Sequence, residues 1–243
     1  MKTISPFRLL PLLLVAVLLF SACSRKVTFA REAGGYRNQK TNVLYRVAPN
    51  YRARAIDEKS PLGTYTSPGG TAVSLYAVEG LDAIADGDYT VYTAESVSLP
   101  AFAELAVGSM DLCYSNAITY AYRSFGEADA ARVQKALATA AQLPYSRVPA
   151  DPSARYDLVF NASELPLSYR LVYLAFDGDV LVHAPLDADG SLPDLYPGVP
   201  CEKVTNASGG EEAVFRFGSQ LLLDRATNVC YPIEDLHSNP EAE

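Results

Sequence analysis

Cysteine and histidine are the residues best able to hold a metal or act as a nucleophile, and this chain has few of either. His183 and His237 are far apart in sequence, and neither has another Cys or His at ligand spacing. Cys113, Cys201 and Cys230 form no C-x-x-C pair. We therefore predict no metal site and no cofactor. The sequence leaves a disulfide among these three cysteines open and favours free, buried thiols.

Three loop motifs match known binding loops only in part. Residues 187–190 (Asp-Ala-Asp-Gly) match the centre of a calcium loop, but Pro185 and Tyr196 stand where its first and last carboxylates belong. This predicts a turn. Residues 67–70 and 208–210 lack the Lys and the following helix of a phosphate loop. The common serine acyl-transfer signatures are also absent.

Carboxylates and tyrosines give less specific signals. A glycosidase needs only two suitably spaced acids from any part of the fold, and 25 acidic residues follow Ser60, so the sequence singles out no pair. Tyr120 with Tyr122, or Tyr169 with Tyr173, could share a sheet face and stack on a sugar or peptide. Packing in the core or at a sheet edge is the favoured interpretation of either pair.

The first 22 residues have the pattern of an export signal. Lys2 and Arg8 precede an apolar stretch over residues 9–20, and Ser21 and Ala22 follow it. As a helix, this stretch would cover about 18 Å of a hydrocarbon core about 30 Å thick, so it is too short to span comfortably. A charged start, a short apolar segment and small residues before a cleavage point are typical of a secretory signal peptide.

The segment Leu19-Phe20-Ser21-Ala22-Cys23 resembles the lipobox of bacterial lipoproteins, in which an aliphatic residue and two small residues precede the lipidated cysteine. Phe20 departs from that pattern, since the family prefers Leu there. The resemblance implies that Cys23 carries a thioether-linked diacylglycerol and becomes the first residue of the mature chain. Acyl chains would then hold the protein on the outer face of a bacterial membrane. The alternative is an ordinary signal peptide with an unmodified cysteine.

Charge is unevenly distributed in this chain, whose net charge is −8. Residues 24–59 contain nine basic and three acidic side chains, whereas the later residues contain 9 basic and 25 acidic. We expect residues 23–40 to form a basic tether that contacts anionic lipid headgroups through Arg25, Lys26, Arg31 and Arg37. Arg46, Arg52 and Arg54 are alternatively outward-facing strand residues. The acidic remainder argues against a nucleic-acid partner.

Residues 41–235 are predicted to form one mainly β domain of the α+β class, an antiparallel sheet with one helix packed on it, followed by a polar tail over 236–243. Alternating apolar residues indicate strands around 73–77, 89–91, 110–114, 118–122, 171–175 and 181–183. The Asp177-Gly178 pair predicts a hairpin that joins 169–176 to 179–185. Thr-Asn-Val-x-Tyr at 41–45 and 227–231 predicts two similar hairpin turns, because Asn tolerates the left-handed conformation.

One amphipathic helix is predicted over residues 125–143. Ser124 and Glu127 fit a capping box at its start, and Pro144 ends it. Its apolar face consists of Ala130, Val133, Leu137 and Ala140. Packing on the sheet is favoured over a partner-binding role for this face.

These patterns predict a lipid-anchored, extracytoplasmic protein of the cell membrane with a non-catalytic binding or envelope-assembly role, because nucleophile arrangements and histidine clusters are missing. The alternative is an extracellular hydrolase that acts on cell-wall or glycan substrates through a carboxylate pair. A structural spacer is a third option. The sequence does not identify the protein or glycan ligand.

Replacing Cys23 tests the anchor. We expect Cys23→Ala either to release the protein from the membrane fraction or to leave its signal uncleaved, because no other segment is long and apolar enough to hold it in a bilayer. Cell fractionation and mass spectrometry of the N-terminus make the measurement. A processed variant that stays on the membrane would show that Cys23 is not the anchor.

Overall fold

The structure is a computed structural model that describes residues 27–114, 121–149, 151–233 and 236. Within them the chain is mainly β, with a single α-helix packed on the sheet, which confirms the predicted β-rich α+β class. The strands are β1 (Val27–Glu32), β2 (Gly35–Asn38), β3 (Leu44–Ala53), β4 (Gly63–Thr66), β5 (Ala72–Ala77), β6 (Ala83–Ala85), β7 (Thr90–Ala94), β8 (Val107–Tyr114), β9 (Ala121–Phe125), β10 (Leu143–Pro144), β11 (Ala154–Ala162), β12 (Leu167–Ala175), β13 (Leu181–Ala184), β14 (Cys201–Thr205), β15 (Glu211–Arg216), β16 (Gln220–Asp224) and β17 (Val229–Pro232). The helices are α2 (Glu127–Thr139) and the 3-10 turns η2 (Phe102–Glu104) and η3 (Tyr145–Arg147).

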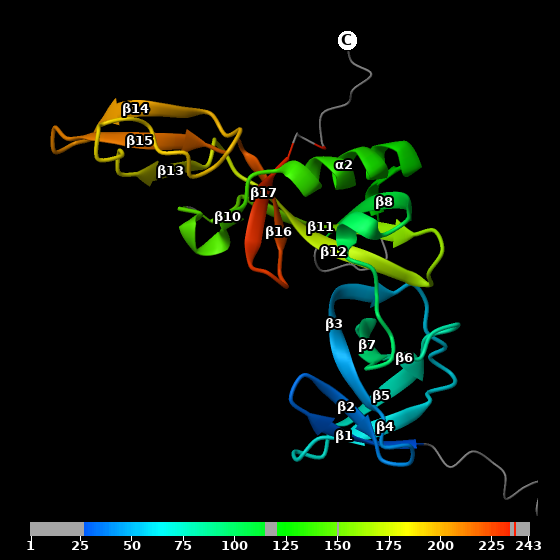
Figure 1. The fold of residues 1–243 in the computed structure, drawn as a ribbon. Helices are drawn as coiled ribbons and strands as arrows, with labels where there is room; N and C mark the ends of the chain where they lie inside the picture. Colours follow the sequence, from blue (N-terminus) through cyan, green and yellow to red (C-terminus); the bar gives the residue numbers. More distant parts are fainter. Residues whose placement is uncertain (1–26, 115–120, 150, 234–235, 237–243) are drawn as a thin grey trace, which may run out of the picture.

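The first seven strands close into a barrel at one end of the molecule (Figure 1). The path β3, β2, β1, β4, β5, β6, β7 returns to β3, because β3 pairs with both β2 and β7. Its pairs are antiparallel except β1 with β4, which is parallel. Phe29, Tyr36, Leu75 and Ile84 belong to its buried core.

This barrel corrects the expected start of the folded domain. The tether predicted over residues 23–40 contains β1 and β2, so folded structure begins by Val27 instead of at residue 41. Phe29 and Tyr36 are each only 2% exposed. Burying these two rings stabilises the fold by more than solvating the neighbouring charges does, and the segment therefore joins the sheet.

β12 is the central strand of the second part of the sheet. One edge pairs with β11, which in turn leads to β8 and β9. The opposite edge is divided, because residues 167–169 pair with β3 and residues 172–175 pair with β16. Arg170 and Leu171 lie between the two paired segments. We call this place the fork of the sheet.

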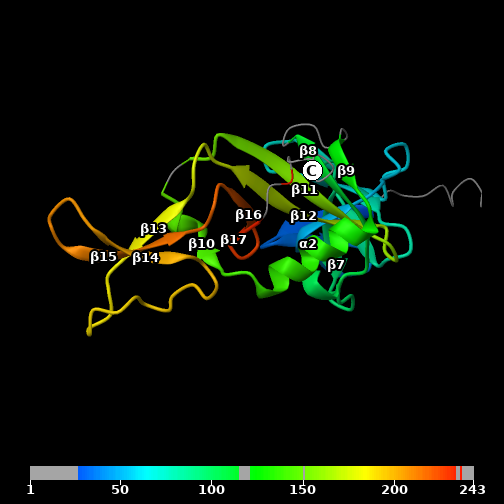
Figure 2. The same cartoon turned by 90° about the horizontal axis from the view of Figure 1, so that it is seen from above.

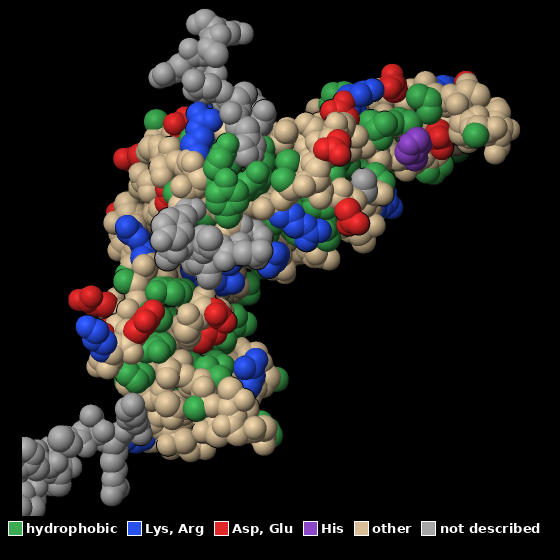
Figure 3. Space-filling model, turned by 180° about the vertical axis from the view of Figure 1, so that it is seen from behind, with side chains coloured by type: hydrophobic (Ala, Val, Ile, Leu, Met, Phe, Trp, Pro, Cys, Tyr) green, Lys and Arg blue, Asp and Glu red, His purple; other side chains and the backbone are tan. Residues whose placement is uncertain are grey.

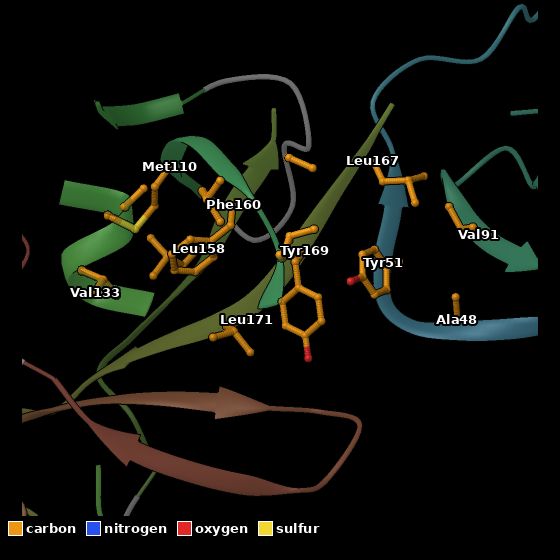
Figure 4. Close-up of a cluster of buried hydrophobic side chains, with 14 of the residues drawn as sticks. Ala48, Tyr51, Val91, Met110, Val133, Leu158, Phe160, Leu167, Tyr169 and Leu171 are labelled. Carbon is orange, nitrogen blue, oxygen red and sulfur yellow. The ribbon is translucent and has the colours of Figure 1, made fainter. Parts of the chain in front are cut away.

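α2 covers one face of the β8–β11–β12 sheet (Figure 4). Ala130, Val133 and Leu137 are buried and belong to the same core cluster as Met110 and Leu158, which confirms three of the four residues predicted for the apolar face. The fourth, Ala140, is the C-cap and is only partly buried. Among the described residues, no helix combines the length and apolar character that crossing a membrane requires.

The predicted start and end of this helix are wrong. Gly126 is its N-cap and no side chain caps it. Ser124 lies in β9 opposite Asp111, and its hydroxyl donates to the Asp111 carboxylate over 2.6 Å. Leu143 is in β10, paired with β17. Strand pairing at both ends thus prevails over the local capping and propensity signals.

The predicted hairpin of residues 169–176 with 179–185 is also wrong. β13 pairs with β15 in a separate three-stranded sheet, whereas β12 pairs with β16. This second sheet, β13–β15–β14, is called the arm because it projects away from the barrel (Figures 1 and 2). Phe176 and Val180 flank Asp177-Gly178 and are buried in the core cluster beneath the arm, which carries the chain from one sheet to the other.

The two predicted Thr-Asn-Val-x-Tyr turns are confirmed. Asn42 and Asn228 have φ angles of 61° and 59°. Their N–H groups donate to the carbonyls of Asn38 and Asp224, each over 2.8 Å. The side-chain oxygens of Asn38 and Asp224 accept two further backbone N–H groups each. These matching turns join β2 to β3 and β16 to β17.

Leu137 tests the packing of α2. We expect Leu137→Ala to lower the free energy of unfolding by about 2–5 kcal/mol, because it opens a cavity between helix and sheet. Urea denaturation of the full-length protein in detergent measures this value. Lys135→Ala on the exposed side of α2 is the control and should change it by about 0.5 kcal/mol or less. Equal effects of the two substitutions would mean that this face is not core.

Candidate functional site

The face of the sheet opposite α2 is polar where β8, β11 and β12 lie side by side. Side chains alternate along a strand, so the residues between the buried apolar positions point to this face. In the register, Asp111 lies opposite Val159, which lies opposite Arg170. One step along the strands, Asn161 lies opposite both Ser109 and Ser168.

A pocket of about 260 Å³ lies over this face, and we call it the large pocket because it is larger than the arginine pocket described below. β3 and the turn before β7 close its remaining sides. Its lining consists of Arg52, Ala53, Arg54, Asp88, Tyr89, Asp111, Cys113, Ala121, Asp157, Val159, Asn161, Ser168 and Arg170. Figure 3 views this side of the molecule, where Lys and Arg side chains gather along the inside of the bend between the barrel and the arm.

A buried ion pair lies in this lining. Arg170 donates to Oδ2 of Asp157, and these two side chains are 19% and 4% exposed. The second carboxylate oxygen of Asp157, Oδ1, is buried and has no hydrogen-bond partner among the described residues. A buried acceptor without a donor costs about 1–3 kcal/mol, so the site keeps one unsatisfied oxygen beside its ion pair.

Asp111 holds a second polar cluster on the same face. One oxygen accepts the Ser124 hydroxyl at 2.6 Å, and the other accepts the Asn161 amide at 2.7 Å. The same Asn161 amide nitrogen donates to Ser109 over 3.1 Å. These bonds connect β9, β8 and β11 and fix the carboxylate in place.

Arg52 reaches this face from β3, opposite Ser168 of β12. It donates to the Tyr51 carbonyl over 2.8 Å, and within the described part of the chain no carboxylate forms an ion pair with it. Burial lowers the pKa of Arg52 from its usual value, and the charge of Arg170 lowers it further, while Asp86 and Asp157 oppose both effects. Two guanidinium groups therefore lie close enough to repel each other.

A second pocket, of about 180 Å³, opens at the fork, and we call it the arginine pocket. Its lining consists of Val47, Pro49, Asn50, Arg52, Thr90, Arg170, Val172, Arg225 and Ala226. Among these described lining residues are three arginines and no acidic residue. Arg52 and Arg170 line both pockets and so form the boundary between them.

Asn50 holds the three branches of the fork together. Its amide nitrogen donates to the Tyr169 hydroxyl over 3.0 Å and to the Asp224 carboxylate over 2.6 Å. Asp224 also accepts the N–H groups of Ala226 and Thr227, which fixes the turn that carries Arg225. The distance between β12 and this turn is thereby set by buried hydrogen bonds.

Backbone strain accompanies Arg52 on both sides. Asn50 has a φ of 65°, and Tyr89, whose carbonyl accepts the Ala53 N–H, has a φ of 61°. A positive φ is uncommon for a residue other than glycine and is unusual for a bulky aromatic one. Strain of this kind persists where the surrounding structure imposes it, often at functional sites.

The predicted membrane-contacting residues are only partly described. Cys23, Arg25 and Lys26 lie outside the described residues. Arg37 pairs with Glu32 through two hydrogen bonds, one of them 2.5 Å long, and Arg31 lies over the ring of Tyr36 and donates to its hydroxyl. Both belong to the β1–β2 hairpin and lie on the barrel, not on a free tether.

The remaining predicted positions serve mainly structural roles. Tyr169 and Tyr173 are buried in the core as favoured, and Tyr120 lies outside the described residues. The residue 187–190 motif is a turn, with Gly190 at φ 80°. His183 pairs with Glu212, and His237 lies outside the described residues. No group of three metal-binding side chains occurs in the described part of the chain.

The three body cysteines are free, as predicted. Cys113 lines the large pocket, and burial, followed by the charge of Asp111, raises the pKa of its thiol. Burial raises the pKa of Cys230 to about 12. Cys201 is only partly buried, unlike the expectation for all three.

The sequence analysis did not single out Asp157, Arg170 or Arg225. A signal was present in the first two, because Asp157, Asn161, Ser168 and Arg170 alternate with buried apolar residues in two neighbouring strands. Polar residues in that pattern predict a sheet face that is not covered by the core. Arg225 carried no such signal, since its position depends on the fork.

The chain matches no known protein-family model, no curated protein and no solved structure.

Arg170 tests the buried ion pair. We expect Arg170→Met to lower the free energy of unfolding by about 3–5 kcal/mol, because it leaves the Asp157 carboxylate buried and unpaired. Adding Asp157→Leu should recover most of this loss. Arg46→Gln, which breaks an exposed ion pair with Glu95, is the control and should cost about 1 kcal/mol or less. Urea denaturation decides, and a double variant as unstable as Arg170→Met would rule out the unpaired charge as the cause.

Proposed function

We propose that this chain is a lipid-anchored bacterial protein on the outer side of the membrane whose β domain binds a small anionic ligand at the Arg52–Arg170 pair. Cys23 is the proposed site of lipid attachment. The role is binding and not catalysis. The observation that carries the proposal is the pair of adjacent guanidinium groups at the boundary of two pockets, one of them without a carboxylate partner among the described residues.

Arginine suits this role because its planar fork of N–H donors matches the two oxygens of a carboxylate or phosphate. Arg52 is partly buried, so an anion beside it is less screened by water than an anion on an open surface. An anion placed between Arg52 and Arg170 relieves their mutual repulsion.

The net charge of the whole chain restricts which anions the proposed site would bind. A net charge of −8 repels anions at long range, so attraction must come from the concave site itself. Arg52, Arg170 and Arg225 supply it within a single pocket. An acidic body with a small concave cationic pocket would disfavour nucleic acids and other large polyanions and accept small ones.

The hydrolase alternative gains no support from the acids of the large pocket. A carboxylate pair must be available to donate or remove protons at a substrate. Asp111 already accepts hydrogen bonds from Ser124 and Asn161, and Asp157 pairs with Arg170. Asp111 and Asp157 are thus each bound by the protein's own donors, which leaves Asp88 alone of the three acids among the described lining residues and favours binding over hydrolysis.

The proposed contact with anionic lipid rests mainly on Arg25 and Lys26. Arg31 adds a charge at the exposed end of the β1–β2 hairpin. Arg37 contributes little, because Glu32 neutralises it.

Arg52 tests the proposed binding. The full-length protein is purified in detergent, and its unfolding temperature is followed during titration with inorganic phosphate, sulfate or citrate at constant ionic strength. A ligand that binds the folded state raises this temperature. We expect Arg52→Gln to weaken anion binding about tenfold to a hundredfold, the range for losing one charge-assisted contact.

Arg46→Gln is the matched control, since it removes a charge from the same strand at an exposed position. It should leave the titrations unchanged. Equal loss in both variants would mean that anions respond only to overall charge. The absence of any anion-dependent stabilisation of the unsubstituted protein would refute the proposal.

A further inference from the structure

The two pockets that meet at Arg52 and Arg170 differ sharply in charge. The arginine pocket adds Arg225 to the shared pair and has no carboxylate in its lining. The large pocket adds Arg54 but also three carboxylates, from Asp88, Asp111 and Asp157. An anionic group would therefore be attracted more strongly to the first pocket, because in the second the three carboxylates offset the guanidinium groups of Arg52, Arg54 and Arg170.

The large pocket instead offers a mixture of donors and acceptors. Its lining includes the carboxylates together with Ser168, Asn161 and the two shared guanidinium groups. Hydroxyl groups suit such a lining because each can both donate and accept, whereas an ammonium group only donates. Asp157 contributes less than Asp111 to such contacts, because its Oδ1 is buried and its Oδ2 is paired with Arg170.

The volumes of the two pockets fit a small ligand that places one part in each pocket. The large pocket has a volume of about 260 Å³, well above the roughly 10–15 Å³ that one water needs, and so has room for a ring-sized group. The arginine pocket, at about 180 Å³, is the smaller of the two and has room for a phosphate or carboxylate group.

We infer that the ligand is an anionic sugar whose charged group lies in the arginine pocket, against Arg52, Arg170 and Arg225, and whose hydroxyl-bearing ring lies in the large pocket, against Asp111 and Asn161. This inference rests on the proposed function, because it assigns an orientation and a chemical class to the anion of the Arg52–Arg170 pair. The charged group is a phosphate or a carboxylate.

The test compares four probes on the full-length protein in detergent by isothermal titration calorimetry: inorganic phosphate, glucose, glucose 6-phosphate and glucuronate. Phosphate carries only the charged group, and glucose carries only the ring. We expect glucose 6-phosphate or glucuronate to bind at least about tenfold more tightly than phosphate, a difference equivalent to one additional hydrogen bond. The comparison of these two sugars distinguishes a phosphate from a carboxylate.

Two substitutions separate the two halves of the site. Arg225→Gln should weaken phosphate and the tighter anionic sugar by similar factors, about tenfold or more. Asp111→Asn keeps the side-chain shape and should weaken only the sugar, with phosphate unchanged. Arg46→Gln is again the control, and thermal unfolding of each variant verifies that it is folded.

Equal affinity for phosphate and for both anionic sugars would overturn the inference, as would an Asp111→Asn variant that binds all probes like the unsubstituted protein. If phosphate still binds and Arg52→Gln abolishes that binding, the proposed function stands while the sugar assignment fails. If no anionic probe binds, both fail.

Discussion

The structure depends on strand β12, because one of its two edges pairs with two different strands. β3 takes its first residues and β16 its last, and the two partners diverge at Arg170 and Leu171. Through β3 the strand is joined to the barrel, through β16 to the strands beside the arm, and through β11 to the sheet beneath α2. A continuous ladder would have left no opening here. The fork therefore creates the arginine pocket, because backbone groups that do not pair leave room for side chains.

Keeping the fork open has a cost that the surrounding core must offset. Asn50 takes a positive φ and bonds to Tyr169 and Asp224, while Asp157 remains buried with one unsatisfied oxygen. The positive φ of Asn50 costs less than it would for most residues, because Asn tolerates the left-handed conformation, and the unsatisfied oxygen of Asp157 costs about 1–3 kcal/mol. On the other face, buried residues such as Leu158, Phe160 and Leu171 pack under α2 and each contribute about 1.5–3 kcal/mol. Burial of side chains on the apolar face of the sheet thus offsets the unfavourable features on its polar face.

The positions of the arginines connect this architecture to recognition. Arg52 comes from the barrel, Arg170 from the central strand and Arg225 from the β16–β17 turn, so three separate elements supply one pocket. Tertiary structure keeps these like charges in place despite their mutual repulsion. Asp224 fixes the turn that carries Arg225, and Asp157 forms an ion pair with Arg170. A site built in this way would be preorganised for the proposed anion, because the cost of bringing like charges together is met during folding.

The sequence by itself determined the features that depend on near neighbours in the chain. These are the β class, the strand periodicity, the apolar face of α2 and the two Asn turns, each set by side-chain alternation or by one residue's backbone preference. Tertiary structure decided what depended on distant partners. The predicted Asp177-Gly178 hairpin does not form, because Phe176 and Val180 are buried in the apolar core under the arm. Ser124 does not cap α2, because it pairs with β8 instead. The arginine pocket likewise arose from residues 52, 170 and 225, which only the forked pairing of β12 brings together, since no local pattern encodes which distant strand a given edge will accept.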